Sequence, residues 1–207
     1  MIDKETRKLK DVVLIPFAKM IGNTIHPVVI TIIGFLIGLA AVASIYLGLF
    51  VLGLVLWVLN RIFDGLDGVC ARYAHKQTDI GGYLDIVVDF FIYTGIPLAF
   101  AFHFNSAPHY LITMLLLGSF YINAAVWMSA SSLYEKYKFK LKDQQTTFIM
   151  PRNIMEGFET IVFFTLFLIF PAHYIFIAAI MTSFMVLSIL TGFIGTLIQV
   201  TKLSRIK

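Results

Sequence analysis

The chain has 207 residues, of which 59% are hydrophobic and only 14% are charged. Its mean hydropathy of +0.87 excludes an ordinary soluble domain and indicates an integral membrane protein. The formal net charge is +4, which suits anionic lipid, and we expect no nucleic-acid partner; Cys70, the single cysteine, cannot form a disulfide within the chain.

The first 26 residues mix basic and apolar side chains. Lys8 and Lys10 are followed closely by Val12 and Leu14, a mixture that favours an amphipathic helix lying among lipid headgroups. A solvated tail is the alternative. The segment contains no compact apolar stretch that ends in a small-residue cleavage site, so no signal peptide is predicted.

Six apolar segments follow, and each approaches the roughly 20 residues that a helix needs to cross the hydrocarbon core. They fall near residues 27–47, 50–72, 80–103, 109–133, 154–170 and 173–199. The sequence therefore predicts an all-α integral membrane protein with six transmembrane helices preceded by an amphipathic interfacial helix. The expected parts are an arm at 1–26, a membrane domain at 27–200 and a tail at 201–207.

The basic residues predict the orientation. If both ends of the chain share one side, the three turns on the other side contain no Lys, Arg, Asp or Glu. All 16 basic residues then belong to the first side, which Lys and Arg near span ends mark as cytoplasmic. We therefore expect cytoplasmic termini and a basic rim facing anionic lipid.

The second and third spans carry four aspartates on either side of the polar turn YAHKQTDI. Asp64 and Asp67 are three residues apart, and Asp85 and Asp89 are four apart, so each helix presents both of its acids on one face. In an antiparallel hairpin they pair at two depths, about 13 and 18 Å of helix from the turn. Four carboxylates are thus predicted to converge in one cavity.

Four convergent anions in a medium of low dielectric must take up protons or collect cations. Carboxylate oxygens without His or Cys favour Mg²⁺ or Mn²⁺ over zinc. Two such ions would balance the four charges, and paired ions of this kind are one means of holding a phosphoryl group. The predicted cofactor is therefore Mg²⁺ or Mn²⁺, as two ions.

Small residues and one arginine accompany the acids. Gly68, Ala71 and Gly81 leave room for a ligand or a facing helix to approach the backbone, although small residues alone are also typical of tight helix packing. The fork of Arg72 matches phosphate oxygens. Asp79, in the turn, is expected to cap the third span.

Together these residues form a spaced pattern of eight. Its members are Asp64, Asp67, Gly68, Ala71, Arg72, Gly81, Asp85 and Asp89. The pattern resembles that of the CDP-alcohol phosphotransferases at every fixed position, and the stretch TIHPVVITIIG is similar to the opening of that family's first span. His26 and Pro27 stand where the family often has Pro-Asn.

The resemblance implies transfer of a phosphatidyl-type group from a CDP-linked lipid such as CDP-diacylglycerol to an alcohol, with release of CMP, in phospholipid biosynthesis. It implies that Asp64, Asp67 and Asp85 hold the metal ions. Asp89 would share in ligation and act as general base. The residues expected to contact CDP are Thr31, Asp64, Gly68, Ala71, Arg72 and Gly81. A homodimer is also typical of the family.

The acceptor stays open among serine, inositol or its phosphate, glycerol phosphate and phosphatidylglycerol. Phe90 follows the last aspartate where some glycerol phosphate branches carry Lys, which disfavours that branch. Arg152 would suit a phosphorylated acceptor, whereas Glu156 would suit an amine or a neutral polyol. The alternative function is a cation or proton-coupled transporter that uses the same aspartates, although no inverted repeat is visible.

Overall fold

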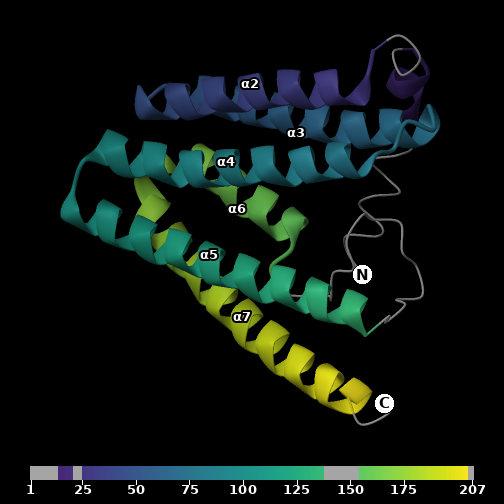
Figure 1. Ribbon diagram of the computed structural model, residues 1–207. Helices are drawn as coiled ribbons and strands as arrows, with labels where there is room; N and C mark the ends of the chain where they lie inside the picture. Colours follow the sequence, from purple (N-terminus) through teal and green to yellow (C-terminus); the bar gives the residue numbers. More distant parts are fainter. Residues whose placement is uncertain (1–13, 21–24, 138–153, 205–207) are drawn as a thin grey trace.

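The computed structural model describes residues 14–20, 25–137 and 154–204, and these residues form helices and short turns without any strand (Figure 1). Residues 14–20 are helical. The later elements are α2 (Pro27–Tyr46), α3 (Phe50–Tyr73), α4 (Asp79–Phe104), α5 (Ala107–Lys136), α6 (Gly157–Ile169), the 3-10 turn η1 (Pro171–His173) and α7 (Tyr174–Ser204). The all-α prediction is confirmed for the described residues.

The helices run up and down in a bundle. Helix α2 packs on α3 and α4, α5 packs on α7, and α6 contacts both α3 and α7. The α3–α4 turn and the last turns of α5 and α7 lie at one end of the bundle, while the α2–α3 and α4–α5 turns lie at the other (Figure 1). Short connections between consecutive helices favour this antiparallel arrangement.

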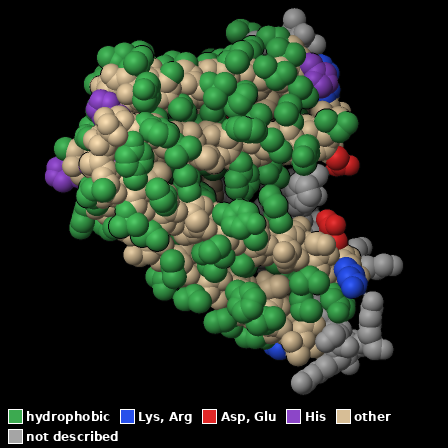
Figure 2. Space-filling view, turned by 60° about the vertical axis from the view of Figure 1, so that its left-hand side comes forward, with side chains coloured by type: hydrophobic (Ala, Val, Ile, Leu, Met, Phe, Trp, Pro, Cys, Tyr) green, Lys and Arg blue, Asp and Glu red, His purple; other side chains and the backbone are tan. Residues whose placement is uncertain are grey.

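The outer surface is apolar along the helices and charged at one end. On the face drawn in Figure 2, the charged side chains gather at the end that carries the α3–α4 turn. Leu36, Val51 and Phe176 are among the many large apolar side chains that stay exposed. Such a surface is stable only in contact with lipid tails or another apolar surface, as expected of an integral membrane protein.

The count of six spans is not confirmed. Four helices, α2, α4, α5 and the segment from Pro171 to Lys202, are long and apolar enough to cross a membrane. Helix α6 has 13 residues, fewer than the roughly 20 that a span needs. Helix α3 has 24 residues but carries Arg61, Asp64 and Asp67. Six spans therefore stay a prediction.

The segment before α2 touches the aspartate hairpin. Leu14 and Ala18, one turn apart, are buried in a cluster with Leu66 and Cys70 of α3. Its amphipathic, interfacial character is not confirmed, because most of the segment lies outside the described residues. Cys70 is a free cysteine and is buried in this cluster, where it serves as a packing residue.

The turn between α2 and α3 lies where the predicted spans place it. Gly48 adopts φ of 79° there, a conformation that glycine reaches without steric cost. At the start of α4, the cap is Thr78, whose hydroxyl accepts a hydrogen bond from the Gly81 backbone N–H at 3.1 Å. The expectation that Asp79 caps the helix is wrong, since Asp79 already belongs to its first turn.

An aromatic core closes the end of the bundle away from the α3–α4 turn. Phe100 of α4 stacks on Tyr174 of α7 with ring centroids 4.8 Å apart, and both rings are fully buried. The Tyr174 hydroxyl lies 2.7 Å from the Thr113 hydroxyl of α5. Packed rings with satisfied polar ends hold the helices together at this end of the bundle.

We predict that Gly48→Ala lowers the free energy of unfolding by about 1–2 kcal/mol, the cost of a left-handed conformation for a residue with a Cβ. The added Cβ would also lie only 2.6 Å from Cε1 of His103. Denaturant titration in mixed micelles measures the change.

Gly118→Ala is the matched control, because its Cβ would meet nothing within 4 Å. Equal stability of Gly48→Ala and the wild type would contradict the strained turn.

Candidate functional site

The four aspartates of the hairpin line one small cavity between α2, α3 and α4. Helix α3 contributes Asp64 and Asp67, and α4 contributes Asp85 and Asp89. The spacing of three and four residues places each pair on one face of its helix, as the sequence predicted. Other lining residues are Thr31, Gly34, Phe35, Asn60, Arg61, Val88 and Ile92.

Asp67 is buried and held by α2. Only 6% of the residue is exposed, and the Thr31 hydroxyl donates a hydrogen bond to its Oδ2 at 2.5 Å. Thr31 itself belongs to the first helical turns after Pro27. The sequence singled out Thr31 as a CDP contact, and the structure places it against a site carboxylate.

Asp89 is held by two donors. Nη2 of Arg61 donates to its Oδ1 at 2.7 Å, and the Tyr93 hydroxyl donates to its Oδ2 at 3.2 Å. Nη1 of Arg61 also lies 3.7 Å from Oδ2 of Asp64. The arginine therefore places one positive charge between carboxylates of the two helices.

Arg61 is fixed by its own neighbours. Oδ1 of Asn60 accepts from its Nε at 2.9 Å and from Nη2 at 2.7 Å, while Nδ2 of Asn60 donates to the Gly34 carbonyl of α2 at 2.8 Å. The guanidinium carbon lies 4.7 Å from the Trp57 ring centroid and 5.3 Å from that of Tyr93, within the range of cation–π attraction.

Arg61 and its partners were not among the site residues predicted from the sequence. The available signal was a basic residue one turn before Asp64, in a stretch that is otherwise apolar, because a charged residue at membrane depth is rare without a function or a partner. The orientation rule had assigned Arg61 only to the basic side of the protein.

Asp85 is the least satisfied of the four acids. Its Oδ1 is buried and has no hydrogen-bond partner. A buried carboxylate oxygen without a donor is costly. It is therefore the atom of the cavity best suited to meet a cation or a donor of a ligand.

Two of the four carboxylates are held by hydrogen-bond donors of their own. Within the described residues, no three His, Cys, Asp or Glu side chains come together as a group that could hold a metal ion. Asp67 turns to Thr31 and Asp89 turns to Arg61, since like charges repel and each carboxylate gains from a donor of its own. The predicted convergence on two ions is not confirmed.

The remaining predicted residues lie toward the α3–α4 turn. A Cβ added at Gly68 would come within 3.4 Å of Nη1 of Arg72, so the arginine lies over this glycine. Ala71 is partly buried beside them. Gly81 belongs to the Thr78 cap, and Arg152 lies outside the described residues.

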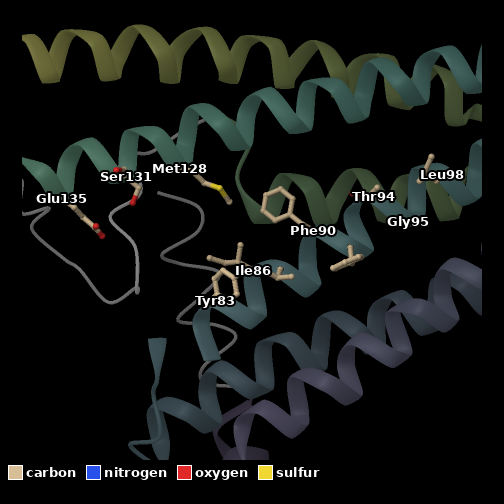
Figure 3. Close-up of a pocket in the computed structure, with 12 residues that line it drawn as sticks. Tyr83, Ile86, Phe90, Thr94, Gly95, Leu98, Met128, Ser131 and Glu135 are labelled. Atoms are coloured by element: carbon tan, nitrogen blue, oxygen red, sulfur yellow. The ribbon is translucent and has the colours of Figure 1, made fainter. Parts of the chain in front are cut away.

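A larger hollow of about 960 Å³ separates α4 from α5. In Figure 3, Ile86 and Phe90 of α4 face Met128 and Ser131 of α5 across it. At 100° per residue, Phe90 lies about 140° around the helix from Asp85, so the hollow and the small cavity lie on different sides of α4. The hollow contains none of the eight pattern residues, so the acids gather in the smaller cavity and not here.

Comparison of the sequence with known proteins identifies a matching family and similar proteins. A family model described as CDP-alcohol phosphatidyltransferase matches residues 24–194. The inner membrane protein YnjF of Escherichia coli strain K12 is 35% identical over 153 residues, which cover 72% of this chain and 72% of YnjF.

Two archaeal relatives match over shorter stretches. A bifunctional IPC transferase and DIPP synthase of Archaeoglobus fulgidus is 31% identical over 87 residues, 42% of this chain and 18% of that protein. An archaetidylinositol phosphate synthase of Pyrococcus horikoshii is 40% identical over 65 residues, 31% of this chain and 35% of that protein. In both cases the alignment spans less than two thirds of the relative.

We predict that Thr31→Val destabilises the protein by about 1.5–3 kcal/mol, the usual contribution of a hydrogen bond to a charged group. The substitution keeps the shape of the side chain but leaves Asp67 without this donor. The free energy of unfolding in mixed micelles measures the effect.

Thr31→Ser retains the hydroxyl and should stay within about 1 kcal/mol of the wild type, the cost of one buried methyl group. If Thr31→Val unfolds like the wild type, this hydrogen bond does not stabilise the site.

Proposed function

Because the chain belongs to the CDP-alcohol phosphatidyltransferase family, a family of membrane phosphotransferases in phospholipid biosynthesis, we propose that it moves the phosphatidyl group of CDP-diacylglycerol to an alcohol hydroxyl and releases CMP. The site would be the cavity between α2, α3 and α4. The observation that carries the proposal is that all four acids of the eight-residue pattern line this cavity.

The cavity offers donors that fit divalent cations. Asp64, Asp67 and Asp85 supply oxygen ligands only, the set that Mg²⁺ and Mn²⁺ prefer, and Oδ1 of Asp85 is buried without a partner. We propose that these three residues hold two ions, with Asp89 at the edge of the set. Bound ions would supply positive charge against the diphosphate of the CDP-lipid.

Asp89 is the proposed general base. Its carboxylate is oriented by Arg61 and Tyr93 and retains lone pairs toward the cavity, since each carboxylate oxygen has two. It would accept the proton of the acceptor hydroxyl as that oxygen forms its bond to phosphorus. The bond from the same phosphorus to CMP breaks, and CMP leaves with the electron pair.

The CDP moiety would extend toward the α3–α4 turn. Gly68 and Ala71 leave the backbone of α3 accessible there, and Arg72 lies over Gly68. A guanidinium matches two phosphate oxygens at once, so Arg72 is the proposed diphosphate contact. Thr31 and Gly81 would border the same ligand from α2 and α4.

The acceptor alcohol is proposed only as a class. The name of the Pyrococcus horikoshii relative favours an inositol phosphate, and Arg152 would then contact the acceptor phosphate. Serine, inositol, glycerol phosphate and phosphatidylglycerol are the other candidates. The transporter alternative gains no support from the family match, which concerns group transfer.

Two further features are proposed from the sequence and the family. We place both termini and the mouth of the site on the cytoplasmic side, because the basic residues gather there. We also propose a homodimer, which a mass measurement of the detergent-solubilised protein would show as twice the mass of 23.4 kDa; a monomeric mass would exclude it.

We predict that purified protein in liposomes releases CMP from CDP-diacylglycerol only with Mg²⁺ or Mn²⁺ and only with one of the candidate acceptors. These are inositol phosphate, serine, inositol, glycerol phosphate and phosphatidylglycerol. Asp64→Asn should remove a metal ligand and Asp89→Asn the base. Each should reduce the turnover number by at least the roughly 10²–10⁴-fold typical of a general base. Release of labelled CMP measures the reaction.

Asp79→Asn is the matched control, since Asp79 belongs to the first turn of α4 and does not line the cavity. Turnover in excess EDTA, or full activity of both site variants, would refute the mechanism. Ion flux across sealed liposomes without CMP release would favour the transporter.

A further inference from the structure

We propose that Arg61 is a positioning residue for this reaction, which holds the Asp89 carboxylate in its working orientation through contacts outside the eight-residue pattern. The inference rests on the proposed function of the site. It assigns a task to a buried arginine, an asparagine and a tyrosine that the pattern does not include.

The donors of Arg61 are already committed to protein partners. A guanidinium has five N–H groups, and those of Arg61 make four hydrogen bonds of 2.7–2.9 Å, two to Asn60 and one each to Tyr93 and Asp89. Only 8% of the residue is exposed. It therefore acts on the reaction through Asp89 rather than by binding a substrate.

The two donors to Asp89 fix the plane of its carboxylate. Arg61 donates a hydrogen bond to one carboxylate oxygen, and the Tyr93 hydroxyl donates one to the other. The same hydroxyl accepts a hydrogen bond from Nη1 of Arg61 at 2.9 Å. The three groups thus form a closed ring of hydrogen bonds, which resists rotation of the carboxylate more than either donor alone.

The support behind Arg61 comes from four helices. Asn60 of α3 anchors it to the Gly34 carbonyl of α2, and Tyr93 belongs to α4. Trp57, fully buried under the guanidinium, donates its indole N–H to the Thr165 hydroxyl of α6 at 3.1 Å. Such support is what holds a reacting group to the tolerance that catalysis requires.

A purely structural role explains these contacts less well. Buried ion pairs seldom stabilise a protein more than apolar side chains of similar volume, and a guanidinium inside an apolar helix is costly. A base, in contrast, must lie within hydrogen-bond reach of the proton it removes. An error of about 1 Å in such placement can reduce the rate about 10²-fold.

The charge of Arg61 yields a second, independent expectation. The guanidinium lies 2.7 Å from Asp89 and 3.7 Å from Asp64, where it repels any other cation. If Arg61 only positions Asp89, its removal leaves Mn²⁺ affinity equal or higher. If Arg61 builds the cavity itself, its removal lowers Mn²⁺ affinity together with stability.

The test compares Arg61→Met, Arg61→Lys, Tyr93→Phe and the double variant Arg61→Met/Tyr93→Phe in the full-length protein. We expect the kcat of Arg61→Met to fall about 10²-fold and that of Tyr93→Phe about tenfold, with KM for CDP-diacylglycerol unchanged. Arg61→Lys should recover part of the loss. The double variant should lose no more than Arg61→Met, because both act through one carboxylate.

Tyr121→Phe is the matched control for Tyr93→Phe, since its ring is 77% exposed on α5. Electron paramagnetic resonance with Mn²⁺ alone gives the metal affinity, and the unfolding midpoint gives stability. If Arg61→Met does not fold, the kcat values of Arg61→Lys and Tyr93→Phe decide whether Arg61 positions Asp89.

Unchanged kcat in the folded variants, additive losses in the double variant, or a higher KM with normal kcat would overturn the positioning role. Weaker Mn²⁺ binding in step with lost stability would make Arg61 structural. A wild-type protein that neither binds Mn²⁺ nor releases CMP would instead overturn the proposed function, and this inference with it.

Discussion

The structure depends on how charge is held among helices that otherwise face lipid. Four carboxylates and one guanidinium share a cavity between α2, α3 and α4, and each needs a partner because an isolated charge in a medium of low dielectric is unstable. Thr31 donates a hydrogen bond to Asp67, and Arg61 donates one to Asp89. Oδ1 of Asp85, in contrast, is buried without a hydrogen-bond partner, which is costly for a carboxylate oxygen.

The same need explains how the three helices pack. A Cβ at Gly38 of α2 would lie 2.9 Å from Nδ2 of Asn60, and one at Gly34 would lie 3.1 Å from Cβ of Phe63. Close approach of α2 to α3 thus lets Asn60 reach the Gly34 carbonyl and hold Arg61. Small residues between membrane helices favour such contact, and here they let a backbone carbonyl hold the asparagine that contacts the buried charge.

Much of the fold and part of the site follow from the sequence. Apolar run length located the helices, and the spacing of Asp64, Asp67, Asp85 and Asp89 placed the acids on facing sides, because both are local properties of a helix. The turn near residue 48 was predicted from the limits of the two spans, whereas the left-handed backbone of Gly48 was not, since no Pro or Asn accompanies the glycine. The contacts of Arg61 with Asp89 and Tyr93 were not predicted either, because they join α3 to α4 and only tertiary packing brings these residues together.

Helix α4 separates two environments of opposite character. One face carries Asp85 and Asp89 into the small polar cavity, and the other carries Ile86 and Phe90 into the apolar hollow beside α5. A helix with polar atoms on one side and apolar atoms on the other can be placed only one way around, since rotation would bury charge against hydrocarbon. The rotation of α4, and with it the direction of Asp89, is therefore set from both sides: by Arg61 and Tyr93 within the cavity, and by the cost of exposing the acids to the hollow.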